Sequence, residues 1–147
     1  MTRIAFCDDD AALLHQIQDL LEQYRALRGV QLELFPYTNP MDLLSDIEAG
    51  ARYDVLFLDV LMPGINGIST AQEIRRYDTA VQIIFITSSS DFAVQSYVVG
   101  AYYYQLKPIW KESFFRLTDA VLAQCRKQTR HSLILRCKSG VTRIALD

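Results

Sequence analysis

Two continuous apolar runs, residues 55–58 and 83–86, constrain the fold of this chain more than any other feature. Continuous runs, unlike alternating ones, are typical of strands that are buried on both faces of a sheet. The five expected strands are residues 4–7, 30–35, 55–58, 83–86 and 102–106, and the expected helices are residues 13–27, 40–50, 68–77, 91–99 and 111–127. This alternation predicts an α/β fold, a doubly wound five-stranded parallel sheet with helices on both faces.

Polar side chains stand where four of the expected strands end. Asp8 and Asp9, Asp59, Thr87 and Lys107 each follow directly on the last apolar residue of a different strand. Ligands of open parallel sheets bind outside the carboxyl ends of the strands, where the strand order reverses. We therefore expect these side chains to form one site.

The carboxylates of this set indicate a bound cation. Asp8, Asp9 and Asp59 would repel one another at close range, and some would take up protons unless a hard divalent ion joined them. Mg²⁺ fits, because proteins hold it with one or two carboxylates together with water and phosphate oxygens. A carboxylate can itself attack phosphorus, while Lys107 and Thr87 offer a charge and a hydroxyl to phosphoryl oxygens. Taken singly, each residue is more often a cap, a turn or a satisfied hydroxyl, but together they indicate Mg²⁺-dependent phosphoryl transfer to an aspartate.

The segments around these residues read IAFCDD, LDVLMPGING, IFIT and YQLKP, and they begin at Ile4, Leu58, Ile84 and Tyr104. Together they resemble the receiver domain of bacterial two-component response regulators, over residues 1–128. The resemblance implies a flavodoxin-like receiver fold with strand order 2-1-3-4-5. It also implies Mg²⁺ as the cofactor and a sensor histidine kinase as the partner that donates the phosphoryl group.

The same resemblance assigns the metal ligands residue by residue. Asp59 would be both the phosphoacceptor and a ligand, and Asp9 would bind the metal directly. Asp8 would act through water, and the backbone carbonyl of Leu61 would be a further ligand.

Three residues would respond to the phosphoryl group. Lys107 would pair with it, ahead of a cis peptide bond at Pro108. Thr87 would move toward it, and Tyr104, three residues before Lys107, would be the switch aromatic that turns inward with Thr87.

The end of the chain differs from the rest in charge. Residues 1–125 carry a net charge of −7, whereas residues 126–147 carry +5. Residues 133–137 and 141–146 flank a Lys-Ser-Gly turn and predict a β-hairpin. The hairpin resembles the opening strands of the LytTR-type DNA-binding domain. We therefore expect residues 129–147 to be a linker and the first hairpin of such a domain in truncated form.

The predicted function is a phosphorylation-controlled switch in a two-component system, not an enzyme beyond accepting its own phosphoryl group and slowly losing it. Phosphorylation would favour a homodimer through the face built by residues 91–99, residues 102–104 and the last helix. The missing C-terminal domain would then bind DNA and control transcription.

Two alternatives remain open at this stage. The order Asp8-x-Asp10 superficially resembles a haloacid-dehalogenase-like Mg²⁺-dependent phosphatase, although that family expects Thr or Val at the position of Ala12 and a late acidic pair that is missing. The other alternative is an interaction module that has lost phosphorylation, which the intact set of site residues disfavours.

The sequence also predicts a cytoplasmic protein without a membrane partner. No apolar run approaches the roughly 20 residues that cross a bilayer, and the N-terminus runs straight into a strand, unlike a signal peptide. The three cysteines, Cys7, Cys125 and Cys137, lack Cys-x-x-Cys spacing, which fits a reducing compartment.

Overall fold

The computed structural model describes the backbone of residues 1–138 and the side chains of residues 1–130. Its elements are, in order, β1 Thr2–Cys7, α1 Ala11–Arg28, β2 Leu32–Tyr37, α2 Pro40–Glu48, β3 Val55–Leu58, β4 Leu61–Met62, β5 Ile65–Asn66, α3 Gly67–Arg75, β6 Gln82–Thr87, α4 Ala93–Val98, β7 Tyr103–Leu106 and α5 Lys111–Lys138. The five main strands pair in parallel in the order β2-β1-β3-β6-β7. This confirms the predicted sheet and its order, once the two-residue strands β4 and β5 are counted apart as a small antiparallel hairpin.

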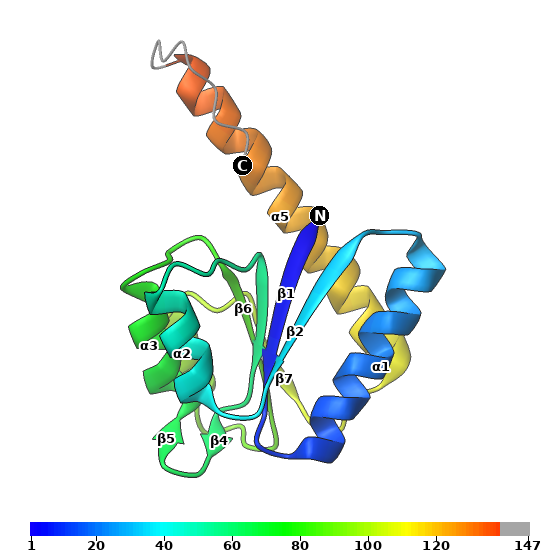
Figure 1. Ribbon diagram of the computed structural model, residues 1–147, viewed down its shortest axis with the longest axis vertical. Coiled ribbons are helices and arrows are strands. Elements are labelled where there is room, and N and C mark those ends of the chain that lie inside the picture. The colour runs from blue at the N-terminus through cyan, green and yellow to red at the C-terminus, as the bar shows by residue number, and fades with distance from the viewer. Residues whose placement is uncertain (139–147) are drawn as a thin grey trace.

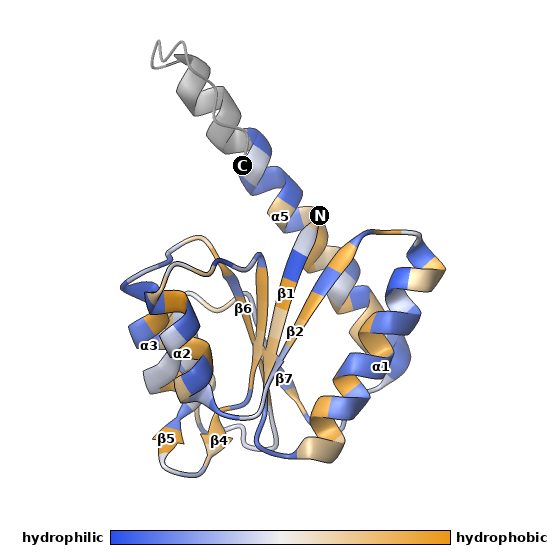
Figure 2. Cartoon of the chain, in the orientation of Figure 1, coloured by the Kyte–Doolittle hydropathy of each residue, from blue (hydrophilic) through white to orange (hydrophobic). Residues whose placement is uncertain are grey.

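Helices cover both faces of the sheet, with α1 and α5 on one side and α2 and α3 on the other (Figure 1). The strands are apolar on both faces accordingly. Phe57 of β3 belongs to the core cluster beneath α1 and α5, whereas its neighbours Leu56 and Leu58 belong to the cluster beneath α2 and α3. In Figure 2 the strands and the inward faces of the helices are the most hydrophobic parts of the chain. The continuous apolar runs thus are strands buried on two sides, as the sequence predicts.

The capping residues explain where α1 begins and ends. The Asp10 side chain accepts hydrogen bonds from the backbone amides of Ala12 and Leu13 at the N-terminus of the helix. Gly29 ends the helix in the left-handed conformation, with φ of 65°. Asp10 is therefore a helix cap, and its side chain points its acceptor oxygen into the first turn.

Apart from the end of α5, the boundaries differ from the sequence prediction by at most two residues, as β2 and α4 illustrate. β2 runs two residues later than expected and includes Pro36. Proline has no backbone N–H to donate to a neighbouring strand, so it is rare in central strands. β2 tolerates it because β2 pairs with β1 alone and is an edge strand. α4 is also shorter than predicted, with only the six residues Ala93–Val98.

The largest difference lies in α5, which continues to Lys138. The prediction that residues 133–137 form a strand is therefore wrong in this structure, since they are the last turns of the helix. A helix satisfies its backbone hydrogen bonds within its own segment, whereas a strand needs a partner strand. The predicted turn and second strand, up to residue 146, lie outside the described residues.

A polar clamp joins the start of α5 to the end of α1. Nε and Nη2 of Arg28 donate to the two oxygens of the Asp119 carboxylate, at 3.1 Å each, and the Tyr24 hydroxyl donates to the same carboxylate. The Arg28 guanidinium also lies 5.4 Å from the centre of the Tyr24 ring. The hydrogen bonds from Arg28 and Tyr24 lower the pKa of Asp119 below its ordinary value.

The clamp leads us to expect a pH dependence of stability. A carboxyl group with a lowered pKa in the folded state stabilises the fold above its unfolded pKa, near 3.9, and loses that contribution as pH falls through the folded pKa. We expect Asp119→Asn to lower the free energy of unfolding at pH 7 by less than about 1 kcal/mol, because the pair is half exposed. In urea titrations the difference from the wild type should shrink below pH 4.

Candidate functional site

The carboxyl ends of four parallel strands bring the predicted site residues to one edge of the sheet. Asp8 and Asp59 directly follow β1 and β3, Thr87 ends β6, and Lys107 follows β7. The backbone amide of Lys107 donates to the carbonyl of Thr87 at 2.8 Å, which continues the β6–β7 ladder into the site. The sheet register therefore assembles side chains that are nearly 100 residues apart in the sequence.

The acidic cluster consists of Asp8, Asp9 and Asp59. Each residue offers a carboxylate oxygen, and the three oxygens lie within 4.8 Å of one another. Asp8 and Asp59 are only 1% and 4% exposed, whereas Asp9 faces solvent. The cluster is therefore open on one side and closed at its base, and all its potential ligands are the hard oxygens that Mg²⁺ prefers.

Backbone amides hold the two buried carboxylates in place. One Asp8 oxygen accepts a hydrogen bond from the amide of Asp10 at 2.8 Å. One Asp59 oxygen accepts from the amide of Leu61 at 3.1 Å. These bonds fix the orientation of each carboxylate and leave its second oxygen to face the site.

Lys107 binds those second oxygens. Its ammonium nitrogen lies 3.2 Å from Oδ2 of Asp8 and 3.1 Å from Oδ2 of Asp59. Burial disfavours the Lys107 charge, but the hydrogen bonds and charges of Asp59 and Asp8 outweigh burial, so the pKa of Lys107 is raised. The lysine is therefore firmly protonated.

A single ammonium does not neutralise this cluster. Burial raises the pKa of Asp8, and the Asp59 charge adds to that effect despite the Asp10 amide and Lys107. The ionised form of Asp8 is thus under-stabilised by the protein groups around it, which is the electrostatic condition that a divalent cation relieves.

Thr87 and Tyr104 both contact the segment after β6. Thr87 is fully buried, and its hydroxyl oxygen accepts from the amide of Ser89 at 3.4 Å. The Tyr104 hydroxyl donates to the backbone carbonyl of Ser89, and its ring packs against Phe85 with the centres 6.2 Å apart. The two predicted switch residues therefore meet at one residue of the β6–α4 segment, and Tyr104 already points inward. The predicted cis peptide bond between Lys107 and Pro108 is confirmed.

Gly67 is a site residue whose role the sequence analysis missed. It begins α3, and a Cβ atom placed on it would lie 2.1 Å from the backbone carbonyl oxygen of Asp59 and 2.8 Å from Cα of Val60. Its own amide donates to the carbonyl of Val60 at 2.8 Å. The lack of a side chain at Gly67 therefore lets α3 pack directly against the backbone that carries Asp59. The sequence shows only the dipeptide Asn-Gly after a Pro-Gly turn, which is typical of many loops.

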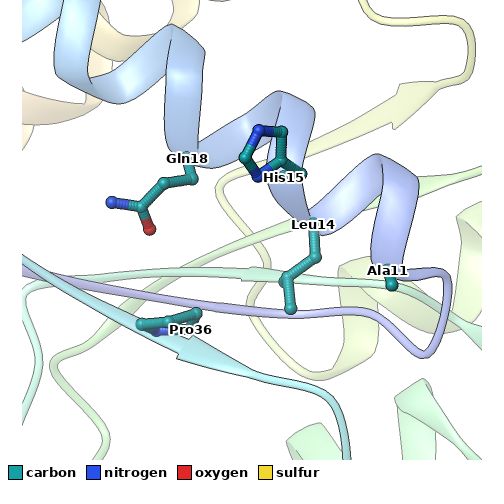
Figure 3. A pocket seen from close by; sticks show the side chains of 5 residues that line it. All are labelled: Ala11, Leu14, His15, Gln18 and Pro36. Atoms are coloured by element: carbon teal, nitrogen blue, oxygen red, sulfur yellow. The ribbon is translucent and has the colours of Figure 1, made fainter.

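A separate surface hollow lies between α1 and the edge strand β2. Figure 3 shows the five side chains that line it: Ala11, Leu14, His15, Gln18 and Pro36. His15 is its one ionisable group, and it lies 3.6 Å from the exposed Asp19 carboxylate. No member of the acidic cluster lines this hollow, so it is distinct from the candidate site.

Comparison with known protein families identifies a match over most of the chain. Residues 4–119 match the family model described as the response regulator receiver domain. The transcriptional regulatory protein RprY of Bacteroides fragilis is 30% identical over 132 residues, which cover 84% of this chain and 50% of that protein. The sensory transduction protein LytT of Oceanobacillus iheyensis is 33% identical over 113 residues, covering 76% of this chain and 44% of LytT. The chain thus spans about half the length of these curated relatives.

Solved structures with the same fold agree. The response regulatory domain of mrkE from Klebsiella pneumoniae superposes with a TM-score of 0.76 at 20% identity, covering 86% of this chain and 99% of that one. The response regulator TrrA from Thermotoga maritima, solved in complex with Mg²⁺–BeF, gives a TM-score of 0.70 at 25% identity, with 82% and 99% covered.

Proposed function

This chain belongs to the response regulator receiver domain family, and from that membership we propose that it accepts a phosphoryl group on Asp59 from a sensor histidine kinase. The observation that carries the proposal is the environment of the Asp59 carboxylate. It is buried at the base of an acidic cluster. One of its oxygens accepts a hydrogen bond from the Leu61 amide, and the other accepts one from the Lys107 ammonium. An aspartate held in this way is oriented as a nucleophile rather than as a surface charge.

In the proposed step an Asp59 oxygen attacks the phosphorus of a phosphohistidine on the kinase. A P–O bond to Asp59 forms as the P–N bond breaks, and the departing imidazole nitrogen keeps the electron pair. Lys107, already charged and within reach of Asp59, stabilises the negative charge on the phosphoryl oxygens. The Thr87 hydroxyl is the neutral donor for the same oxygens.

The donor set fits Mg²⁺. Asp8, Asp9 and Asp59 would hold the ion, and the resemblance adds the backbone carbonyl of Leu61. When bound, the ion supplies the positive charge that the cluster lacks and offsets the repulsion between the incoming phosphoryl group and the carboxylates. TrrA, the relative solved with Mg²⁺–BeF, supports this assignment by similarity.

The signal would leave the site through Thr87 and Tyr104. Both contact Ser89, so a shift of Thr87 toward the phosphoryl group would move the segment that leads into α4. The outer face of α4 is strongly apolar, because Val94, Tyr97 and Val98 are 78%, 85% and 76% exposed. Together with Tyr103 of β7 it would form the α4–β7–α5 face for a phosphorylation-dependent homodimer.

The proposed output is control of transcription by a C-terminal DNA-binding domain. Relatives described as transcriptional regulators support this output in general terms. In the described residues no helix is both long and apolar enough to span a membrane. The proposed partners, a kinase and DNA, would place the activity in the cytoplasm.

The phosphatase alternative is weakened by Asp10. That mechanism would need the second aspartate of Asp8-x-Asp10 as a general acid, but the Asp10 carboxylate caps α1. Receiver domains are signalling domains, and the proposed chemistry is one transfer per protein molecule.

Incubation with acetyl phosphate and Mg²⁺ followed by intact-mass measurement tests directly whether the chain accepts one phosphoryl group. A stoichiometric acyl phosphate is expected, whereas sustained release of phosphate over many turnovers would favour the phosphatase.

Metal binding gives a second prediction. A ligand that binds only the folded state adds RT ln(1 + [L]/Kd) to stability, about 2.7 kcal/mol at a hundredfold excess over Kd. We expect Mg²⁺ to raise the melting temperature of the wild type, and a chelator to abolish labelling by acetyl phosphate. Asp9→Asn should lose the thermal shift. Asp10→Asn should keep it, because asparagine still caps a helix; an equal loss in both variants would contradict the assigned ligands.

A further inference from the structure

α5 continues well past the part of it that packs on the sheet. Leu122 is its last buried core residue and Cys125 is half-buried, whereas every residue from 126 to 130 is exposed. Figure 1 shows this part of the helix projecting away from the body of the molecule. We propose that the projecting part of α5 binds the phosphate backbone of duplex DNA directly, through Arg126, Lys127 and Arg130. The inference rests on the proposed role in transcription control, but it places a DNA contact within this chain itself.

The charge of this segment is separated from the acidic body. Residues 126–138 contain five lysines and arginines and no acidic residue, while residues 1–125 carry −7. Among the described residues, no carboxylate forms an ion pair with Arg126, Lys127 or Arg130. Cations that no carboxylate of the body neutralises remain available for an external polyanion.

Most arginines elsewhere on the described surface have polar partners, and Arg116 is the exception. Arg3 pairs with Glu33, Arg28 with Asp119 and Arg76 with Glu73. Arg75 is half-buried and donates to four backbone carbonyls, those of Asp78, Val81, Val99 and Gly100. The described part of the projecting helix is thus distinguished by three neighbouring cations without a carboxylate partner and by the absence of acidic residues.

Helix geometry places the three side chains side by side. At 100° per residue, positions 126, 127 and 130 fall within an arc of about 100°, and they span about 6 Å along the helix axis. Duplex DNA presents one phosphate per about 3.4 Å along each strand. One face of α5 can therefore contact neighbouring phosphates without bending either partner.

Two other occupants fit this segment less well. In a parallel pair of copies, the same three cations would face each other along the helix, which is destabilising. A membrane surface would require an apolar face, but residues 126–130 read Arg-Lys-Gln-Thr-Arg, and Figure 2 shows the described part of the projecting helix as hydrophilic. Residues 126–130 therefore offer cations and polar groups without an apolar face, which suits contacts to phosphates.

The test measures binding of the full chain to a fluorescent 20-base-pair duplex of arbitrary sequence, by anisotropy at several salt concentrations. Each phosphate that the protein neutralises contributes about −0.9 to the slope of log K against log salt. We expect the combined variant Arg126→Gln, Lys127→Gln and Arg130→Gln to reduce the steepness of this slope by about 2 to 3, since three phosphates would no longer be neutralised. Its affinity at low salt should also fall at least tenfold, with unchanged helix content by circular dichroism.

The matched control removes three positive charges from the body, with Arg76→Gln, Lys111→Gln and Arg116→Gln. It should leave the slope within error of the wild type; an equal loss in both variants would show a general charge effect and overturn the proposal. Tighter binding to anionic vesicles than to DNA would also overturn it. A wild-type chain that is labelled normally by acetyl phosphate but does not bind the duplex would refute this inference and leave the proposed function standing.

Discussion

Replacing Asp59 with asparagine is expected to abolish phosphoryl acceptance, with labelling by acetyl phosphate and Mg²⁺ falling to background. The amide has nearly the shape of the carboxylate and can still accept a hydrogen bond from the Leu61 amide, which reaches Oδ1 at 3.1 Å. It lacks the negatively charged oxygen that attacks phosphorus. Without this nucleophile the transfer cannot take place, so we expect the reaction to be lost rather than slowed. The label is located by peptide mass spectrometry after conversion of the acyl phosphate with hydroxylamine.

The control for this result is Asp19→Asn, an exposed aspartate on α1 whose nearest ion-pair partner is His15. It should be labelled as fully as the wild type. A thermal melt of both variants checks that folding is retained, which is expected because Asp59→Asn removes one of three clustered negative charges. Label that persists on Asp8 or Asp9 in the Asp59→Asn protein would move the acceptor within the cluster and contradict the assignment.

The sheet was predictable from sequence because its central strands are buried on both faces. Residues 55–58 and 83–86 have no polar position at all, and a strand between two layers of helices buries such a run completely. The polar residues that end these strands were predictable for the same reason. Parallel strands present their carboxyl ends at one edge, so knowing the strands also gave the neighbours in the site.

The C-terminal strand shows where the same reasoning fails. Residues 133–137 have the apolar character of a strand, but a strand must find hydrogen-bond partners outside its own segment. The structure continues α5 through them to Lys138, since each added helical residue makes a bond within the segment already formed. The apolar pattern of residues 133–137 does not reveal whether a partner strand is present, and that partner decides between strand and helix.

The hydrogen bonds that orient the site were also beyond the sequence. The Leu61 amide that donates to Asp59 and the Ser89 carbonyl that accepts from Tyr104 are backbone groups. Every non-proline residue carries the same two groups. Which of them faces a given side chain depends on the fold of the connecting segment. The small β4–β5 hairpin after Asp59, two residues per strand, is too short to leave a periodic pattern.

Gly67→Ala is expected to have the second-largest effect, because the new methyl group would meet the backbone of Asp59, the proposed phosphoacceptor. Its Cβ would lie 2.1 Å from the Asp59 carbonyl oxygen and 2.8 Å from Cα of Val60. Neither atom can rotate away as a flexible side chain can, so α3 or the segment after β3 must shift. We expect a loss of about 3 kcal/mol in the free energy of unfolding, the upper part of the usual range for overpacking, measured by urea titration.

The displaced backbone is that of Asp59 itself, so the rate of labelling by acetyl phosphate should fall as well, even where the protein remains folded. Gly64→Ala is the matched control. Gly64 has φ of 83°, and its added Cβ would meet nothing within 4 Å, so alanine there costs only about 1–2 kcal/mol of backbone strain. Both variants lose stability, but only Gly67→Ala should lose labelling at a temperature where each is folded. Equal labelling in the two would show that the close approach of α3 supports the fold without positioning Asp59.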